Sequence, residues 1–159
     1  MKVKVRPATI DDAFDACDVI RSSIIECCKD DHRGDAAVLQ AWLLNKTPEF
    51  VQRLIITPGA FSVAASIDEV MVGFGSATQT GEMTLCYVAP SFRFMGIGKA
   101  LLAAIEKTLA QAGVGTLRLE STRTARAFYL RNGFVPAGSP VLTFGIEGLP
   151  MRKELMPSG

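Results

Sequence analysis

The first third of the chain has the apolar spacing of helices. Between about 11 and 29, apolar residues recur mostly three and four positions apart, which predicts an amphipathic helix. The run Thr9-Ile-Asp-Asp12 places a capping residue three positions ahead of an acid at the start of this helix, and the polar run 30–34 ends it. A second helical stretch covers 38–43. A third begins at Thr47-Pro48, a capping residue followed by proline, and runs to about 57.

The rest of the chain alternates between short strands and helices. Val3 and Val5, each between charged neighbours, predict a first strand. Three β-rich runs separated by turn residues predict an antiparallel meander, and they cover 60–67, 70–78 and 82–88. A strongly periodic helix opens at Gly96, and a strand (116–120), a helix (124–131) and further β structure from 134 follow it. This order predicts an α+β fold in a single domain, 1–159, with a strand–helix–strand crossover in its second half.

Composition narrows the class of protein. With 159 residues, 48% of them hydrophobic and 21% charged, the chain suits one globular domain. A formal net charge of +1 argues against nucleic acid as a partner, and the absence of a long apolar run argues against a membrane. The amino terminus lacks the apolar core of a secretory signal. The four cysteines have neither metal-ligand spacing nor a disulfide framework, so we expect a reducing, cytoplasmic setting and no metal.

The clearest chemistry lies in a glycine-containing loop between a strand and a helix. The first N–H groups of a helix have no partner within the helix, and its dipole adds partial positive charge there. Gly96 and Gly98 let a phosphate approach the backbone closely, and Arg93 and Lys99 supply cationic donors. The loop matches neither the P-loop pattern nor the dinucleotide-binding G-x-G-x-x-G. From these residues alone, an anion site and a structural turn stay open.

Two blocks of sequence resemble the GNAT superfamily of acyl-CoA-dependent N-acetyltransferases. The first, Arg93-Phe-Met-Gly96-Ile-Gly98, is similar to that family's signature and lies, as there, at the head of a long helix. The second, 122–134, has an Ala and a Tyr before a Gly-Phe pair, and 149–155 is similar to the closing strand. The resemblance covers about 60–155. It implies a mixed, mostly antiparallel central sheet flanked by helices, with a cofactor-binding core at about 82–135 and acceptor-side helices at about 11–57.

The resemblance implies acetyl-CoA as cosubstrate and an amine, on a small molecule or a peptide, as acceptor. The CoA pyrophosphate is expected on the amides of the glycine loop. The pantetheine arm is expected along the strand that ends at Val88, where an amide near Tyr87 or Val88 polarises the acetyl carbonyl. Thr122 stands where the family often has Asn, so its hydroxyl, or that of Ser121, replaces the amide. The cofactor-binding residues so predicted are Tyr87, Val88, Arg93, Phe94, Met95, Gly96, Ile97, Gly98, Lys99, Thr122, Ala125 and Phe128.

The same resemblance supplies candidates for acid–base chemistry. Tyr129 matches the family's tyrosine near the CoA sulfur, where a phenol protonates the leaving thiolate. Without the resemblance, the sequence favours an aromatic core residue at Tyr129, near the end of the helix and beside Phe128. Glu82 is the first candidate for the general base, because it opens the strand whose far end holds the thioester. Glu120, at the end of the next strand, is the second, and for Glu82 a solvated position next to a turn is the competing interpretation.

Other polar residues receive structural interpretations. His32 is expected in an exposed loop, Asp30 and Asp31 at a solvated helix end, and Cys86 as a packed thiol rather than a nucleophile. A CoA-binding sensor or scaffold without catalysis is the alternative from another functional class. An enzyme that takes a longer acyl-CoA, or acylates a hydroxyl, is a closer alternative. The acceptor's identity is not encoded in any recognisable motif, and a homodimer through the terminal strand is an expectation from the resemblance.

Overall fold

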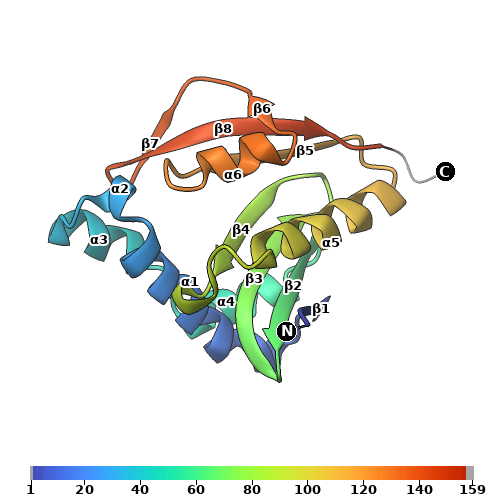
Figure 1. The fold of residues 1–159 in the computed structure, drawn as a ribbon, viewed down its shortest axis with the longest axis horizontal. Helices are drawn as coiled ribbons and strands as arrows, with labels where there is room; N and C mark the ends of the chain where they lie inside the picture. The colour runs from blue at the N-terminus through green and yellow to red at the C-terminus, as the bar shows by residue number, and fades with distance from the viewer. Residues whose placement is uncertain (1, 157–159) are drawn as a thin grey trace.

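Two four-stranded sheets form the framework of the protein, which a computed structural model describes over residues 2–156 (Figure 1). The strands are β1 (Lys4–Pro7), β2 (Ala60–Ile67), β3 (Val70–Thr78), β4 (Met83–Val88), β5 (Thr116–Ser121), β6 (Val135–Pro136), β7 (Val141–Thr143) and β8 (Ile146–Glu154). The helices are α1 (Ala13–Cys27), α2 (Lys29–His32), α3 (Ala36–Leu43), α4 (Pro48–Ile56), α5 (Ile97–Gln111) and α6 (Arg126–Arg131), with 3₁₀ turns η1 (Ile10–Asp12) and η2 (Pro90–Phe92). This arrangement confirms the predicted α+β class.

The first sheet is the predicted meander with the amino-terminal strand added at its edge. Its order is β1-β2-β3-β4, and every neighbouring pair is antiparallel. β2 and β3 have the predicted bounds, and β4 begins one residue later than predicted. Helix α5 lies directly on β3, because Gly73 has no side chain: a Cβ there would come within 2.9 Å of Ile97 and Leu101. The sheet therefore places the start of α5 beside the end of β4.

The second sheet diverges from the first and makes the molecule V-shaped. β8 pairs with β5 on one side and with β6 and β7 on the other, all antiparallel. The two sheets meet where β4 and β5 begin, through a parallel bridge between Glu82 and Arg118 and a 2.7 Å hydrogen bond from the Arg118 N–H to the Gly81 carbonyl. From there β4 and β5 separate (Figure 1). The expected central sheet is thus split between these two strands.

Helices cover the first sheet on both faces. α5 packs on one face, together with the inner side of the second sheet and Tyr129. Helices α1, α3 and α4 pack on the other face around Phe74 of β3. Ile146, at the start of β8, joins this second core. The carboxy-terminal sheet is therefore anchored to the amino-terminal helices at one end of the V.

The polar run after α1 differs from its prediction. Residues 30–34 were expected to form an exposed loop, but Lys29–His32 form a further helical turn in which Asp31 and His32 are buried, with 7% and 3% of their surface exposed. The His32 ring accepts a hydrogen bond from the Gly34 N–H at Nδ1, and Nε2 faces the carbonyl oxygens of Ile24 and Ile25 at 3.1 and 3.2 Å. Burial is tolerated because backbone groups satisfy both ring nitrogens. His32 is a structural residue that closes the end of α1.

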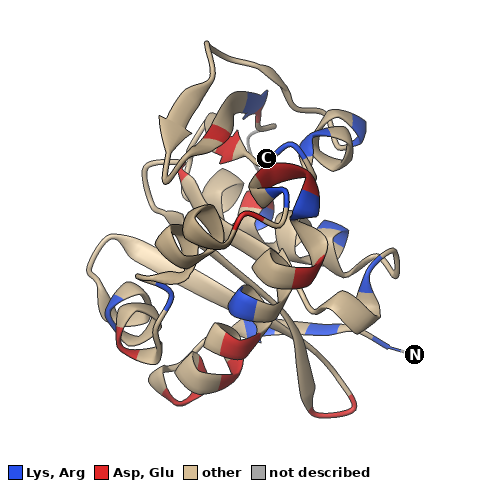
Figure 2. Cartoon of the chain, turned by 90° about the vertical axis from the view of Figure 1, so that its left-hand side faces the viewer, with Lys and Arg blue, Asp and Glu red and all other residues tan. Residues whose placement is uncertain are grey.

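The charged residues are spread over the surface. Figure 2 shows Lys and Arg interspersed with Asp and Glu on the face that carries the amino-terminal helices. In the part of the chain that the structure describes, none of the helices has the length and apolar character needed to cross a bilayer.

Candidate functional site

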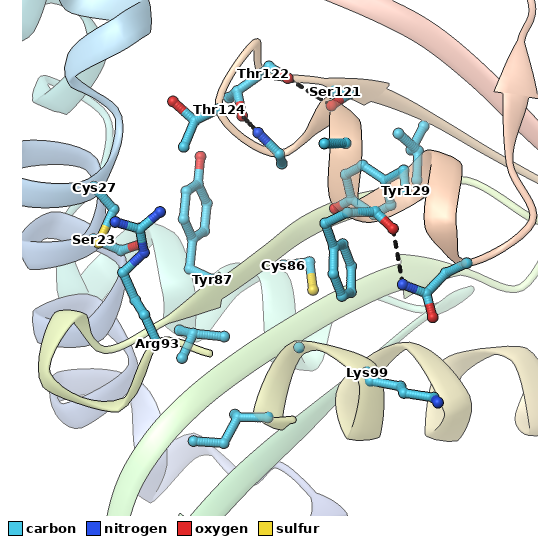
Figure 3. A pocket seen from close by; sticks show the side chains of 18 of the residues that line it. Ser23, Cys27, Cys86, Tyr87, Arg93, Lys99, Ser121, Thr122, Thr124 and Tyr129 are labelled. Atoms are coloured by element: carbon cyan, nitrogen blue, oxygen red, sulfur yellow. Dashed lines mark hydrogen bonds between the residues drawn. The ribbon is translucent and has the colours of Figure 1, made fainter. Parts of the chain in front are cut away.

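A cavity of about 780 Å³ occupies the gap between β4 and β5 (Figure 3). Its walls come from α1, β4, the loop before α5, the end of β5 and helix α6. A volume of this size is ordinary for the binding site of a small molecule or cofactor. The cavity exists because the two sheets separate, so the geometry of β4 decides its shape.

A β-bulge changes the direction of β4 at Thr84. Ala77 of β3 pairs with Met83 and Ser76 pairs with Leu85, which leaves Thr84 as the extra residue. Because of the bulge, Met83 and Leu85 point to opposite faces of the sheet although they are two residues apart. Met83 packs in the core under α5, whereas Leu85 packs in the core under α1. A bulge also bends a strand and increases its twist. We attribute the separation of β4 from β5 to this bend.

The open edge of β4 presents backbone groups to the cavity. The Ala89 N–H donates to the Val72 carbonyl at 2.8 Å, and Tyr87 pairs with Phe74 two residues earlier. Because antiparallel pairs alternate between hydrogen-bonded and non-bonded types, the N–H and C=O of Val88 point away from β3, into the gap. Of the two amides expected to polarise a carbonyl, that of Val88 faces the cavity and that of Tyr87 faces β3.

The glycine loop forms the amino-terminal end of helix α5. Gly96 is its N-cap, with a φ of +81° that favours glycine. The first intrahelical bond runs from Ala100 N–H to Gly96 O at 3.0 Å, so the three preceding amides have no partner within the helix. Gly98 lies under the Phe128 ring, which a Cβ would approach to 3.3 Å. The loop thus offers unpaired N–H groups and a close backbone approach at the cavity's edge.

Side chains of the loop flank these amides. The Arg93 guanidinium lies over the Phe94 ring, 4.8 Å from its centre, and in Figure 3 it extends toward Ser23 and Cys27 of α1. Phe94 is 91% exposed and has a φ of +63°, an unusual conformation for a residue with a side chain. Lys99 lines the cavity on the α5 side. Cations therefore stand on both sides of the unpaired amides.

Tyr129 reaches the cavity from helix α6. Its ring packs edge-on against Phe128 and Phe134, with centres 5.2 and 5.4 Å apart, and only 6% of the residue is exposed. Its hydroxyl lies beside the Cys86 thiol. Burial raises the pKa of Tyr129 well above its ordinary value, and burial raises the pKa of Cys86 to about 11. Both groups are therefore neutral at pH 7, a phenol that keeps its proton and a thiol that is a poor nucleophile.

The loop before α6 uses the Thr122 hydroxyl locally. Thr122 Oγ1 accepts a hydrogen bond from the Ala125 N–H at 3.1 Å, and the Ser121 hydroxyl donates to the Thr122 carbonyl at 2.6 Å. Both residues line the cavity. The Thr122 oxygen already accepts one hydrogen bond, so it can still offer a ligand its O–H hydrogen and its second lone pair.

The two candidate bases lie in different places. Glu82 is exposed, beside the junction of the sheets, and is not among the residues that line the cavity. Glu120 lines the cavity, and Gly148 opposite leaves room for its side chain, since a Cβ there would approach it to 3.4 Å. Among the described residues Glu120 is the one acidic residue that lines the cavity, and its side chain is exposed on the face of β5 opposite Leu119 and Ser121.

The structure brings most of the predicted site residues together. All the predicted cofactor-binding residues except Met95 line the cavity, as does Tyr129. The wall formed by Ser23, Cys27 and Cys28 was not predicted, although their spacing along one face of α1 was an available signal. Asp31, expected at a solvated helix end, is instead buried against the loop before α6. Residues 2–156 contain no group of three or more His, Cys, Asp or Glu side chains placed to hold a metal ion.

Comparison with known proteins gives a consistent result. The family model of the acetyltransferase (GNAT) domain matches residues 28–155. An amino-acid acetyltransferase from Pseudomonas putida is 37% identical over 76 residues, which cover 48% of this chain and 16% of that protein. A Bacillus subtilis relative is 27% identical over 75 residues. The chain spans about half the length, or less, of the curated relatives it matches.

Solved structures have the same fold. A GCN5-related N-acetyltransferase from Rhodopseudomonas palustris superposes with a TM-score of 0.86 at 23% identity, over 98% of this chain and 97% of that one. The PaiA N-acetyltransferase from Thermoplasma acidophilum, solved in complex with coenzyme A, gives a TM-score of 0.79 at 22% identity, over 97% and 99% of the two chains. Identities this low establish the fold alone.

Proposed function

Because the chain belongs to the GNAT acetyltransferase family, we propose that it is an acetyl-CoA-dependent N-acetyltransferase that transfers the acetyl group directly to an amine. The observation that carries this proposal is one cavity shared by three features: the free amides of α5, the outward-facing Val88 N–H and the buried Tyr129 phenol. They match the phosphates, the acetyl carbonyl and the leaving sulfur of one cosubstrate.

The cosubstrate's position follows from these three features. The Gly96–Gly98 backbone and the flanking cations suit the pyrophosphate. The open edge of β4 suits the amide-containing pantetheine arm, which can pair with the strand's outward N–H and C=O groups. Phe128 and Ala125 would line the arm's other side, as residues of the cavity wall. The reacting thioester then lies between Val88 and Tyr129.

Each protein group has one task in the reaction. The Val88 N–H donates to the acetyl oxygen, where negative charge develops as the amine attacks. The Tyr129 hydroxyl gives its proton to the sulfur as the carbon–sulfur bond breaks. The nitrogen loses one proton as it becomes an amide, and this proton restores the neutral phenol, so that the amide product and CoA thiol result. The attacking amine must first lose a proton. Holding the two reactants in line supplies much of the rate, so acid and base need only be adequate.

Glu120 is the base that we propose, with Glu82 as the competing assignment. Glu120 lies at the edge of the cavity, from which its carboxylate can take the amine's proton through water, whereas Glu82 lies at the outer end of β4. Glu120→Gln is therefore expected to lower kcat about 10²-fold near pH 7, and Glu82→Gln, the matched loss of one carboxylate, to leave it within about twofold. If steady-state assays showed that Glu82→Gln lowers kcat more than Glu120→Gln does, Glu82 would be the base.

The cavity wall also bears on the acceptor. The α1 side presents Ser23, Cys27, Cys28 and the Tyr87 ring, and burial raises the pKa of Cys28 to about 12 and raises that of Tyr87, so these two groups stay uncharged. The charged lining residues are three cations and one acid: Arg93, Lys99, Arg131 and Glu120. We propose a small acceptor amine whose other groups are neutral or anionic, because this wall offers a polycation little attraction.

Two broader features belong to the same proposal. The four cysteines are free, which supports a reducing, cytoplasmic compartment. The exposed apolar residues of β7, Val141 and Leu142, suit a homodimer in which this edge is covered. Gel filtration with light scattering would measure the oligomeric state.

The proposal is tested by ligand binding and by turnover in one preparation. Acetyl-CoA at 100 times its Kd is expected to stabilise the fold by about 2.7 kcal/mol, or about 5–10 °C in Tm for a chain of this length. Release of CoA thiol is then followed with a panel of amino acids, amino sugars, polyamines and peptides. Stabilisation without thiol release from any amine would favour a CoA-binding sensor. No stabilisation at millimolar ligand would contradict the cofactor assignment.

A further inference from the structure

A buried carboxylate joins the two arms of the V at its open end. Asp31 Oδ1 accepts a hydrogen bond from the Arg123 N–H at 2.7 Å, and Oδ2 accepts from the Thr124 hydroxyl at 2.6 Å and from the Thr124 N–H at 3.3 Å. Asp31 belongs to α2, which continues the acceptor-side helices, and its partners lie 92 and 93 positions later, in the loop before α6. The contact crosses from the first sheet's helices to the second sheet.

The Asp31 contact lies at the end of the V opposite the junction of the two sheets. The sheets are fastened at one end by the bridge between Glu82 and Arg118, and they separate toward Val88 and Ser121. α2 lies at the opposite, open end, next to the loop that precedes α6 (Figure 1). The cavity lies between these two fastenings, so the length of the Asp31 contact helps to set the width of the gap.

The partners of Asp31 belong to the proposed site. Thr122, Thr124 and Ala125 are wall residues around the contact, and α6, which carries Tyr129, begins directly after them. On the other side, the α1 residue Cys27 and its neighbour Cys28 line the cavity just before α2. A change at Asp31 therefore acts on both walls and on the helix of the proposed acid, although Asp31 itself is not a lining residue.

We propose that Asp31 is a positioning residue: its carboxylate is a strut that holds the loop before α6 against α2 and so fixes the width of the acyl site between Val88 and Tyr129. The neighbouring Arg123–Glu147 ion pair joins this loop to β8 within the second sheet, so it does not bridge the V. The Arg123–Glu147 ion pair is largely exposed, whereas Asp31 is buried, so losing its carboxylate would leave buried donors without an acceptor. The inference rests on the proposed function, because it concerns the same acyl site.

The chain offers matched variants for a test. Asp31→Asn keeps the shape but places an NH₂ group against one of two donor sites, so at least one buried donor loses its acceptor. Asp30→Asn makes the same change of charge at the exposed neighbour. Thr124→Val removes the hydroxyl donor at constant shape, and Thr124→Ser retains it. If Asp31→Asn fails to fold, the Thr124 pair still decides the question.

The informative measurement is acyl-length selectivity rather than activity alone. Each variant is assayed with acetyl-CoA and butyryl-CoA, for kcat/KM and for Kd by thermal shift. Loss of the strut is expected to lower kcat/KM for acetyl-CoA about tenfold or more, since misplacement by about 1 Å is enough for such an effect. It is also expected to raise the ratio of kcat/KM for butyryl-CoA to kcat/KM for acetyl-CoA about threefold or more, because a wider gap excludes the longer acyl chain less well. Asp30→Asn should behave as wild type, and Thr124→Ser, which keeps the donor, should lie closer to wild type in this ratio than Thr124→Val does.

The outcomes separate this inference from the proposed function. One outcome is that wild type turns over acetyl-CoA, while Asp31→Asn and Thr124→Val keep the wild-type selectivity ratio, even if kcat/KM falls for both acyl-CoAs by the same factor. Asp31 is then a stabilising residue and not a strut. If wild type shows no turnover, the proposed function fails, and the ratio of the two Kd values still tests the strut. An unchanged Kd ratio in both variants would then overturn it.

Discussion

Replacing Tyr129 by phenylalanine is expected to lower kcat by about 10²–10⁴-fold, the usual contribution of a general acid, while the Kd for acetyl-CoA changes little. The ring's packing against Phe128 and Phe134 stays, so the fold keeps its core. What is lost is the proton for the departing sulfur. Steady-state kinetics and a thermal-shift titration on the same protein measure the two quantities.

Tyr87→Phe is the matched comparison, because it removes the same hydroxyl from the chain's other tyrosine, in the wall of the same cavity. It is expected to lower kcat far less, since the Tyr87 side chain packs toward Trp42 and the core under α1. Unchanged turnover in Tyr129→Phe would leave Tyr129 as a core aromatic residue and remove it from the mechanism.

The environment of Tyr129 also affects how kcat depends on pH. Burial raises the pKa of Tyr129, and the active form of a general acid is the protonated one, so raising the pKa extends activity toward alkaline pH. Ionisation of Tyr129 should therefore cause no fall in kcat between about pH 7 and 10. A fall in that range that Tyr129→Phe abolished would contradict the burial argument.

The second large effect is expected from Gly96→Asp, which should raise the Kd for acetyl-CoA about 10²-fold or more. A carboxylate at the N-cap of α5 would face the pyrophosphate, and apposition of like charges costs several kcal/mol. The wild-type position has open space, because a Cβ added to Gly96 would have no atom within 4 Å. Isothermal titration with acetyl-CoA measures the change.

Gly113→Asp controls for the backbone strain and for the added negative charge, away from the proposed phosphate site. Gly113 follows the other end of α5, has a φ of +82° against +81° for Gly96, and also has open space around it. Both variants carry the same left-handed strain of about 1–2 kcal/mol. An acid stabilises a helix at its amino terminus and destabilises it at its carboxyl terminus, so Gly96→Asp should unfold no earlier than Gly113→Asp. If both variants bound acetyl-CoA as wild type does, the glycine loop would be only a turn.

Local pattern was sufficient for much of the fold. β2 and β3 have their predicted bounds, and α5 begins within one residue of its predicted start. Alternation of apolar residues, turn residues with positive φ and helical periodicity all depend on neighbours in sequence. For the same reason, residues of the glycine loop and Tyr129 were identified in advance: each belongs to a short block whose spacing is itself the signal.

The chain's sequence thus determined the elements, the glycine loop and the family, whereas tertiary structure decided the site. The bulge at Thr84 depends on the register of β4 against β3, and it decides that Val88 rather than Tyr87 turns its amide to the cavity. Of the two candidate bases, only Glu120 belongs to the residues that line the cavity. Asp31 and His32 belong to a run that is polar in sequence, yet both are buried, because the partners of Asp31 lie more than 90 positions away and those of His32 are backbone groups. No local pattern records a partner that the folding chain supplies from elsewhere.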